Sequence, residues 1–347
     1  MSRADRKIDH INYALSTAAA SGAGFEDVKF VHQSLPNSAV DDISLQTNMG
    51  ELTLSSPFFI NAMTGGGGEQ TKTLNEGFAI AARETGLMLS VGSQMAAVKE
   101  PGERDTYTVT RKVNPNGMIA GNLGSEASLD QAKYAVDMIE ANALQIHLNV
   151  VQELAMPEGD RAFTGALKRI EAIVNGLDVP VIVKETGFGM SKETARKLKE
   201  AGVSVIDVGG YGGTNFSKIE NHRQKRQLTF FNDWGIPTVP SIVEAGEAFS
   251  SVIASGGISQ SIDVIKALSL GASAAGIAGS FLKILTENGT EGLIEEINAM
   301  KMEQKILMTA LGAKNVEELR KLPLIISGQT YHWLHMRDMQ PERFARR

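Results

Sequence analysis

The sequence predicts a (β/α)8 TIM barrel, an α/β fold in which eight parallel strands alternate with helices. Three observations favour it: recurring apolar, β-branched runs, helical patterns between those runs, and glycine-rich turns after the last two. Eight such units suit a closed barrel better than an open doubly wound sheet. We therefore expect one domain whose barrel spans residues 57–285, with an N-terminal extension, 1–56, and C-terminal helices, 286–347.

The eight predicted strands are short apolar runs bounded by polar or glycine residues. In chain order they cover residues 58–63, 88–93, 118–123, 143–149, 180–186, 203–209, 251–256 and 272–278. Helices are predicted between them by their capping residues. Ser128 and Gln131 form a capping box at the start of helix 128–141, and helix 191–201 begins at Ser191 and is followed by Gly202.

Composition excludes several classes of function. The formal net charge is −6, so a broad basic surface for nucleic acid or anionic lipid is not expected. The chain has no cysteine, which removes disulfides, thiolate metal sites and cysteine nucleophiles. The uncharged, apolar run 267–282 is shorter than the roughly 18–20 residues of a membrane span, and the charged first residues do not resemble a signal peptide. We expect a cytoplasmic protein.

The fourth run carries polar residues on one face. Gln145, His147 and Asn149 alternate with apolar residues, so they share one side of the strand. If the apolar side faces the helices, these three point into the barrel toward the rim where catalytic groups gather in this fold. The alternative is a buried hydrogen-bond network without a catalytic role.

Lys184 occupies a similar place on the fifth run. A buried ammonium group needs an anionic partner, so Lys184 is expected to bind phosphate or to stabilise developing negative charge. The alternative is an ion pair with a neighbouring carboxylate. Ser93 and Asn122 end the second and third runs, and together these residues outline one rim.

Three glycine-rich stretches follow strands. Residues 255–259 and 276–280 come after the seventh and eighth runs, where this barrel usually binds phosphate on backbone amides. Residues 61–68 would let the backbone approach a flat ring closely. Each stretch alone could be an ordinary turn. No dinucleotide-binding or Walker motif is present.

Two further segments could serve the same site. The polar stretch 212–234 is long for a loop after a strand and is a candidate lid, with a disordered insertion as the alternative. Glu153 follows the fourth run and could help bind Mg²⁺, which prefers one or two carboxylates together with substrate phosphate. Taken by itself, Glu153 is expected to be a surface residue.

These motifs together resemble type II isopentenyl diphosphate isomerase, the FMN-dependent form, along essentially the whole chain. The most specific motif is the string from His147 to Glu153. The others are Arg6-Lys7 with His10, residues 62–66, 90–94, Gly121-Asn122, Lys184-Glu185, residues 212–214 and the two glycine cradles.

The resemblance implies a role for each matching residue. It implies Gln152, His147 and Lys184 as catalytic residues, and Glu153 as the Mg²⁺ ligand. Ser259 departs from the family pattern, which often has Arg there, so side-chain charge at the first cradle is in doubt. The implied substrate-binding residues are Arg6, Lys7, His10, His147, Asn149 and Gln152, and the implied FMN-binding residues are Ala62, Met63, Thr64, Ser93, Asn122, Lys184, Thr214, Gly256, Gly257, Ile258, Ala278 and Gly279.

The resemblance also implies the reaction. Isopentenyl diphosphate and dimethylallyl diphosphate would be interconverted for isoprenoid biosynthesis, with reduced FMN as acid/base cofactor, Mg²⁺, and NADPH as reductant. A homotetramer or homo-octamer is implied as well. One rival is an FMN-dependent 2-hydroxy acid oxidase, whose catalytic His is followed by Gly and Arg, whereas the only His near the sixth run here is His222. A non-catalytic phosphate-binding barrel is the other rival.

Overall fold

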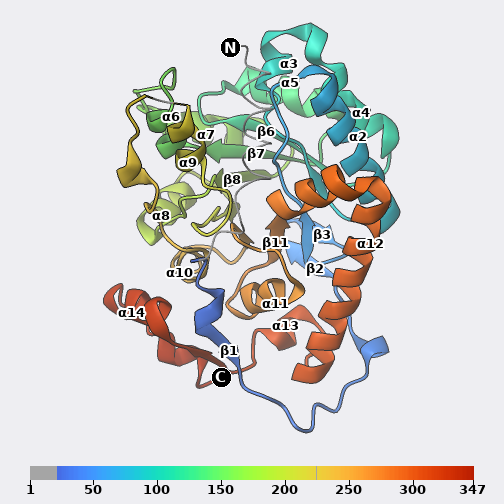
Figure 1. The fold of residues 1–347 in the computed structure, drawn as a ribbon, viewed down its shortest axis with the longest axis vertical. Helices are drawn as coiled ribbons and strands as arrows, with labels where there is room; N and C mark the ends of the chain where they lie inside the picture. The colour runs from blue at the N-terminus through green and yellow to red at the C-terminus, as the bar shows by residue number, and fades with distance from the viewer. Residues whose placement is uncertain (1–21, 224) are drawn as a thin grey trace.

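The computed structural model describes residues 22–223 and 225–347, which form a closed barrel of eight parallel strands surrounded by helices (Figure 1). Every strand of the barrel overlaps one predicted run, and β11 pairs with β4 to close the barrel, so the predicted fold is confirmed. The barrel strands are β4 (Phe58–Ile60), β5 (Leu89–Ser90), β6 (Ile119–Gly124), β7 (Ala143–Leu148), β8 (Val181–Glu185), β9 (Val205–Asp207), β10 (Val252–Ser255) and β11 (Ala274–Ile277).

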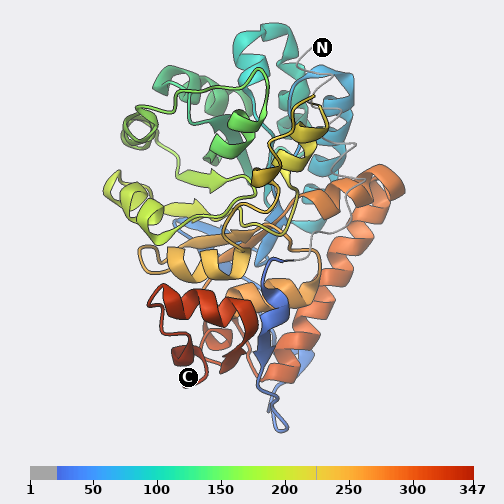
Figure 2. The ribbon, with the colours of Figure 1, turned by 60° about the vertical axis from the view of Figure 1, so that its left-hand side comes forward.

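Helices connect successive strands and cover the outside of the barrel (Figure 2). The predicted capping box is present, with the Ser128 hydroxyl accepting from the Gln131 amide at the start of α5. Ser191 caps α8 in the same way. The helices of the barrel layer are α2 (Gly68–Thr85), α4 (Asp105–Val113), α5 (Leu129–Ile139), α7 (Ala166–Gly176), α8 (Lys192–Glu200), α10 (Thr238–Ala245), α11 (Ser261–Ser269) and α12 (Gly279–Leu311), and short helices α3 (Met95–Lys99), α6 (Val150–Ala155) and α9 (Phe216–His222) lie in the loops.

An apolar plug fills the N-terminal end of the barrel. The hairpin of β2 (Thr47–Met49) and β3 (Leu52–Leu54) contributes to it, and its buried side chains pack against inward-facing residues such as Phe59 and Ile182. Because side chains alternate along a strand, a residue two positions beyond an inward apolar one also points inward. Polar residues placed there face the C-terminal end of the barrel.

Two strands near opposite ends of the described chain pair with each other. Strand β1 (Val28–Phe30) pairs antiparallel with β12 (Leu324–Ile326), so the segment after α12, expected to be helical, also contains a strand. This segment includes the helices α13 (Val316–Leu319) and α14 (Gly328–Met336), and α12 itself is broken at Gly289, where φ is 72°. Among the described residues, no helix combines the length and apolarity needed to cross a membrane.

The segment 212–234 is more structured than its polar sequence suggests. Asn215 accepts a hydrogen bond from the Lys218 amide and begins α9, which contacts α6. A turn of 3₁₀ helix, Thr229–Phe231, follows, and the Ser217 hydroxyl donates to the Phe231 carbonyl at 2.8 Å. Short polar side chains therefore hold a helix where a loop was expected.

Candidate functional site

The polar faces of β7 and β8 point into the barrel as the alternation predicts. Ala143 and Ile182 belong to the apolar plug, and Gln145 and Lys184 lie two residues further along the same faces. Gln145 is fully buried and Lys184 is 8% exposed, whereas His147, nearer the rim, is half-buried. The C-terminal end of the barrel interior is therefore polar.

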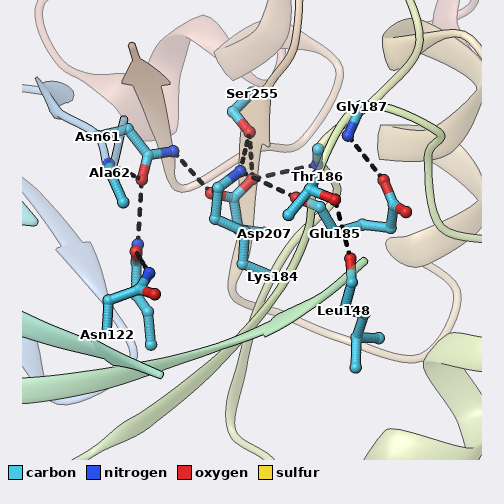
Figure 3. Close-up of polar contacts among 12 residues, drawn as sticks. Asn61, Ala62, Asn122, Leu148, Lys184, Glu185, Thr186, Gly187, Asp207 and Ser255 are labelled. Atoms are coloured by element: carbon cyan, nitrogen blue, oxygen red, sulfur yellow. Dashed lines mark hydrogen bonds and ion pairs between the residues drawn. The ribbon is translucent and has the colours of Figure 1, made fainter. Parts of the chain in front are cut away.

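Lys184 has a carboxylate partner within the protein. Its ammonium nitrogen lies 3.2 Å from Oδ2 of Asp207, at the end of β9, and donates to the Ser255 hydroxyl at 3.0 Å and to the Glu185 carbonyl at 2.9 Å (Figure 3). The ion pair with a neighbouring carboxylate, raised as the alternative, is thus present. The Asp207 carboxylate balances the charge of the ammonium group in the barrel interior.

A chain of side-chain amides continues from the same carboxylate. Asn61 donates to Asp207 Oδ2 at 2.8 Å, and Gln145 donates to the Asn61 oxygen at 3.1 Å. Asn122 donates to the Gln145 oxygen at 3.1 Å, and the Asn122 oxygen lies 2.9 Å from Nδ1 of His147. His147, Asn122 and Lys184, predicted separately as site residues, therefore belong to one network.

Glu185 faces the other way from Lys184 and holds a turn. Its Oε2 accepts hydrogen bonds from the backbone amides of Gly187, Phe188 and Gly189, at 2.8, 2.6 and 3.1 Å. Burial raises the pKa of Glu185 to about 8, although these backbone hydrogen bonds and the Lys184 charge act in the opposite direction. The carboxyl group thus organises the loop after β8.

Glycines bring the loops after β9 and β10 into direct contact. Gly256 has φ of 100°, and a Cβ atom there would lie 2.0 Å from the Gly210 carbonyl oxygen. A Cβ atom on Gly213 would lie 2.7 Å from the Gly257 amide nitrogen. Only glycine permits this backbone contact, because any side chain would push the two loops apart.

The first turn of α12 is suited to an anion. Its N-cap residue, Ala278, supplies no side-chain cap, so the first amides of the helix depend on another acceptor. The Ser280 hydroxyl is buried and has no hydrogen-bond partner among the described residues. A Cβ atom on Gly279 would lie 3.2 Å from Thr214 Oγ1, so the loop after β9 also reaches this point. Amides and hydroxyl groups without acceptors are the donors a phosphate monoester requires.

The start of α11 differs, because it already holds an acceptor. Oδ2 of Asp263 accepts from the Ser259 amide at 3.3 Å and from the Gln260 amide at 3.2 Å. A phosphate at those amides would meet this carboxyl group. Of the two predicted cradles, the one at α12 is therefore better suited to the phosphate, because the Ser259 backbone amide already donates to Asp263.

The segment after β4 is fixed against the loop after β5. The Thr64 hydroxyl donates to Asn75 at 2.6 Å and accepts from the Gly92 amide at 3.3 Å. A Cβ atom on Gly92 would lie 1.0 Å from the Thr64 carbonyl oxygen, so the backbones touch there. Ala62, Met63 and Ser93 are half-buried beside this contact. A planar ring would meet a rigid, mostly backbone surface.

Gln152 and Glu153 lie on the short helix α6, beyond the end of β7. Gln152 is buried at 7% exposure. Oε1 of Glu153 accepts from the Asn149 side chain at 2.8 Å, and its Oε2 accepts from the Asp160 amide at 2.9 Å. These contacts fix the orientation of the carboxylate. No group of three His, Cys, Asp or Glu side chains that could hold a metal ion occurs in the described part of the chain.

Some predicted site residues lie outside the described residues, and some members of the network were missed. Arg6, Lys7 and His10 belong to the first group. Asp207 and Ser255 belong to the second, although Asp207 is the only charged residue in its apolar run and could have been found by that signal. Asn61 begins the glycine-rich stretch 61–68, and no local pattern marks it as a site residue.

Comparison with known proteins gives the class to which this site belongs. Residues 78–325 match the family model described as FMN-dependent dehydrogenase. The match spans more than half of the chain, which therefore belongs to the FMN-dependent dehydrogenase family.

More narrowly, the chain belongs to the family of isopentenyl-diphosphate delta-isomerases. It is 56% identical to the protein of that name from Geobacillus sp. (strain WCH70), over 99% of both chains. The identity is 57% to the protein of that name from Bacillus mycoides (strain KBAB4), over 100% of both. The resemblance inferred from the motifs is thereby confirmed.

Solved structures agree with the fold. Mandelate oxidase with (S)-2-phenylpropionate superposes with a TM-score of 0.65 at 20% identity, over 94% of this chain and 98% of that one. A flavocytochrome b2 variant with sulfite bound gives a TM-score of 0.66 at 19% identity, over 92% and 83%. At this identity the likeness concerns the barrel alone.

Proposed function

We propose that this chain is an isomerase that interconverts isopentenyl diphosphate and dimethylallyl diphosphate, with FMN bound at the C-terminal rim of the barrel. The proposal rests on the full-length similarity to proteins named isopentenyl-diphosphate delta-isomerase. The polar rim and the cradle at α12 support it, because a flavin phosphate and a flat ring both have a suitable surface there.

FMN would lie between the cradle at α12 and the segment after β4. Its phosphate would take the amides of Gly279 and Ser280, the Ser280 hydroxyl and Thr214, with the Gly256–Gly257 turn and Ile258 beside it. Its ring would rest against Ala62, Met63 and Thr64, within reach of Ser93, Asn122 and Lys184. The donors at the phosphate end are the observation that carries this placement.

The proposed reaction moves a double bond. A proton leaves the second carbon of isopentenyl diphosphate and another arrives at its terminal methylene, with no net oxidation or reduction. A plain alkene is a weak base, so the site needs a strong, well-placed acid. Reduced FMN would supply this acid/base chemistry when bound. His147, Asn149 and Gln152 would hold the isoprenyl group and the diphosphate beside it, and the buried amide of Gln152 would do so without adding charge.

The diphosphate would be neutralised from two sides. Glu153 would share Mg²⁺ with it, since its carboxylate is already oriented by Asn149 and by the Asp160 amide. Arg6, Lys7 and His10 would bind the diphosphate oxygens from the N-terminal extension. We also propose NADPH as the reductant of FMN, a cytoplasmic location and a homotetrameric or homo-octameric assembly.

An omission experiment tests the proposed function. The flavin-free protein is given isopentenyl diphosphate with FMN, Mg²⁺ and dithionite, and each component is left out in turn while dimethylallyl diphosphate is measured. We expect product only in the complete mixture. Formation of product without FMN, or no product in any mixture, would contradict the proposal.

A further inference from the structure

We propose that Asp207 is a positioning residue that fixes the tautomer of His147 from across the barrel. It would act through three amide side chains, those of Asn61, Gln145 and Asn122. The inference concerns the hydrogen on Nδ1 of His147. It follows from which group donates and which accepts in each hydrogen bond between these side chains. Only its consequence for substrate rests on the proposed function.

The carboxyl group of Asp207 is an anchor because every group around it is a donor. The Lys184 ammonium and the Asn61 amide face Oδ2, at 3.2 and 2.8 Å. The Gly209 amide donates to Oδ1 at 3.2 Å. Ser255 accepts from Lys184 and therefore donates its own hydrogen to Oδ1 of Asp207. An ionised carboxylate has only acceptor oxygens, so it satisfies all four partners at once.

This anchor sets the orientation of Asn61. The Nδ2 of Asn61 must face Asp207, which leaves its oxygen to accept elsewhere (Figure 3). That oxygen accepts from the Ala62 backbone amide at 2.9 Å, a donor that cannot reverse. A flipped Asn61 would place its oxygen against the Asp207 carboxylate and its NH₂ group against the Ala62 N–H, and both contacts would be buried mismatches.

The orientation of Asn61 then fixes the orientation of the next two amide side chains. A primary amide has one accepting and one donating end, so the polarity of one amide fixes that of the next. Gln145 donates to the Asn61 oxygen and therefore turns its own oxygen to Asn122. Asn122 donates to that oxygen and therefore presents Oδ1 to Nδ1 of His147.

Because these side chains are buried, each amide must keep the orientation that its neighbour sets. Asn61 and Asn122 are 2% and 3% exposed, and Gln145 and Asp207 are fully buried, so solvent is excluded along the chain. An amide with the wrong orientation could not find water to replace the lost partner. The polarity set at Asp207 therefore reaches His147 across side chains that come from four different barrel strands or their ends.

At His147 the consequence is a single tautomer. Because Oδ1 of Asn122 only accepts, Nδ1 must carry the hydrogen, and the neutral ring can then only accept at Nε2. In the proposed function, Nε2 of the neutral imidazole thus acts as an acceptor, and it becomes a donor only after the ring gains a proton. Asp207 would set this choice without touching the substrate.

Nitrogen NMR of the FMN-loaded protein labelled with ¹⁵N-histidine tests the inference directly. The two-bond nitrogen–proton correlations distinguish the Nδ1–H from the Nε2–H tautomer of a neutral ring. The chain has six histidines, and the pattern that disappears in His147→Gln belongs to His147. We expect the Nδ1–H pattern in the absence of substrate. An Nε2–H pattern would overturn the inference.

Three variants test whether Asp207 and the amide side chains set the tautomer of His147. Asp207→Asn removes the anchor, and Gln145→Met breaks the chain while leaving the pair of Lys184 and Asp207 intact; in both we expect loss of the pure Nδ1–H pattern. Ser255→Ala is the matched control, because it removes a donor to the same carboxylate outside the chain, and it should keep the wild-type pattern.

Folding is checked by circular dichroism, and Gln145→Met decides alone if Asp207→Asn does not fold. The wild-type pattern in folded Gln145→Met, or its loss in Ser255→Ala, would overturn the proposed chain. Because no substrate is present, these outcomes do not depend on isomerase activity, so failure of the proposed function and failure of this inference are separate results.

Discussion

The Lys184 ammonium nitrogen lies 3.2 Å from Oδ2 of Asp207, and neither residue is more than 8% exposed. Two groups of opposite charge thus sit at the centre of the polar end of the barrel. Replacing only one residue of such a buried ion pair lowers the stability of the protein strongly, because the remaining charge has no counterion. The pair therefore links the stability of the barrel to the residues proposed to surround the flavin.

Replacing Lys184 tests this link. We expect Lys184→Met to lower the free energy of unfolding by about 3–5 kcal/mol, since Asp207 would stay buried without its partner. Flavin content should fall as well. The double variant Lys184→Met/Asp207→Asn serves as the control and should be less destabilised than the single one in urea unfolding. A single variant with wild-type stability and flavin content would remove Lys184 from the site.

The Ser280 hydroxyl provides a test of where the phosphate binds. Ser280→Ala should weaken FMN binding by about 1.5–3 kcal/mol, the size of a hydrogen bond to a charged group, or roughly 10- to 150-fold in Kd. Riboflavin, which lacks the phosphate, is the matched control ligand and should bind both proteins equally. Fluorescence titration of flavin-free protein measures both constants. An equal loss for the two flavins would place the phosphate elsewhere.

Gln152 and Glu153 should respond differently to magnesium. Glu153→Gln keeps the shape of the side chain but loses a charge, so excess Mg²⁺ should partly restore its activity. Gln152→Ala removes a buried amide that metal cannot replace, so no Mg²⁺ concentration should restore it. Steady-state rates over a Mg²⁺ series measure both. The proposed roles are wrong if the two variants respond alike.

The raised pKa of Glu185 predicts a dependence of stability on pH. Its pKa rises from 4.5 to about 8 in the folded protein, chiefly through burial, so the folded state binds this proton more tightly. The stabilisation from this group is fully present below pH 4.5 and is lost as the pH rises to 8.

Glu185→Gln can still accept the three backbone N–H groups through its amide oxygen, and it does not ionise. Its stability relative to wild type should therefore increase between pH 4.5 and 8, by at most about 1.4 kcal/mol per pH unit. Thermal unfolding across that range measures the difference. A constant difference would show that the carboxyl group is ionised throughout.

The fold could be predicted because its signals are local. Each strand is a run of apolar residues, and capping residues such as Ser128 and Ser191 mark helices within a few positions. The strands are mostly shorter than their runs, since the apolar pattern continues into the turn where pairing ends. The helix α9 was missed because its stability comes from contacts distant in sequence, such as that of Ser217 with Phe231.

The candidate site was predictable in part. Alternation along β7 and β8 placed Gln145, His147 and Lys184 inside the barrel. Their partners could not be read from one strand, because Asn61 and Asp207 are 146 residues apart and meet only when the barrel closes. The helix that begins at Val150 also escaped prediction, although Asn149, a residue type preferred at N-caps, stands at its N-cap position; the Asn149 side chain donates to Glu153 instead of capping the helix.

The stoichiometry of the reductant tests the central claim most directly. An isomerisation moves a double bond without net electron change, so reduced flavin should persist through many turnovers. We predict that the oxidised, FMN-loaded protein is inactive in air, becomes active after reduction by NADPH without oxygen, and then forms many molecules of dimethylallyl diphosphate for each NADPH consumed. Consumption of one NADPH per product would contradict the account and indicate a reductase.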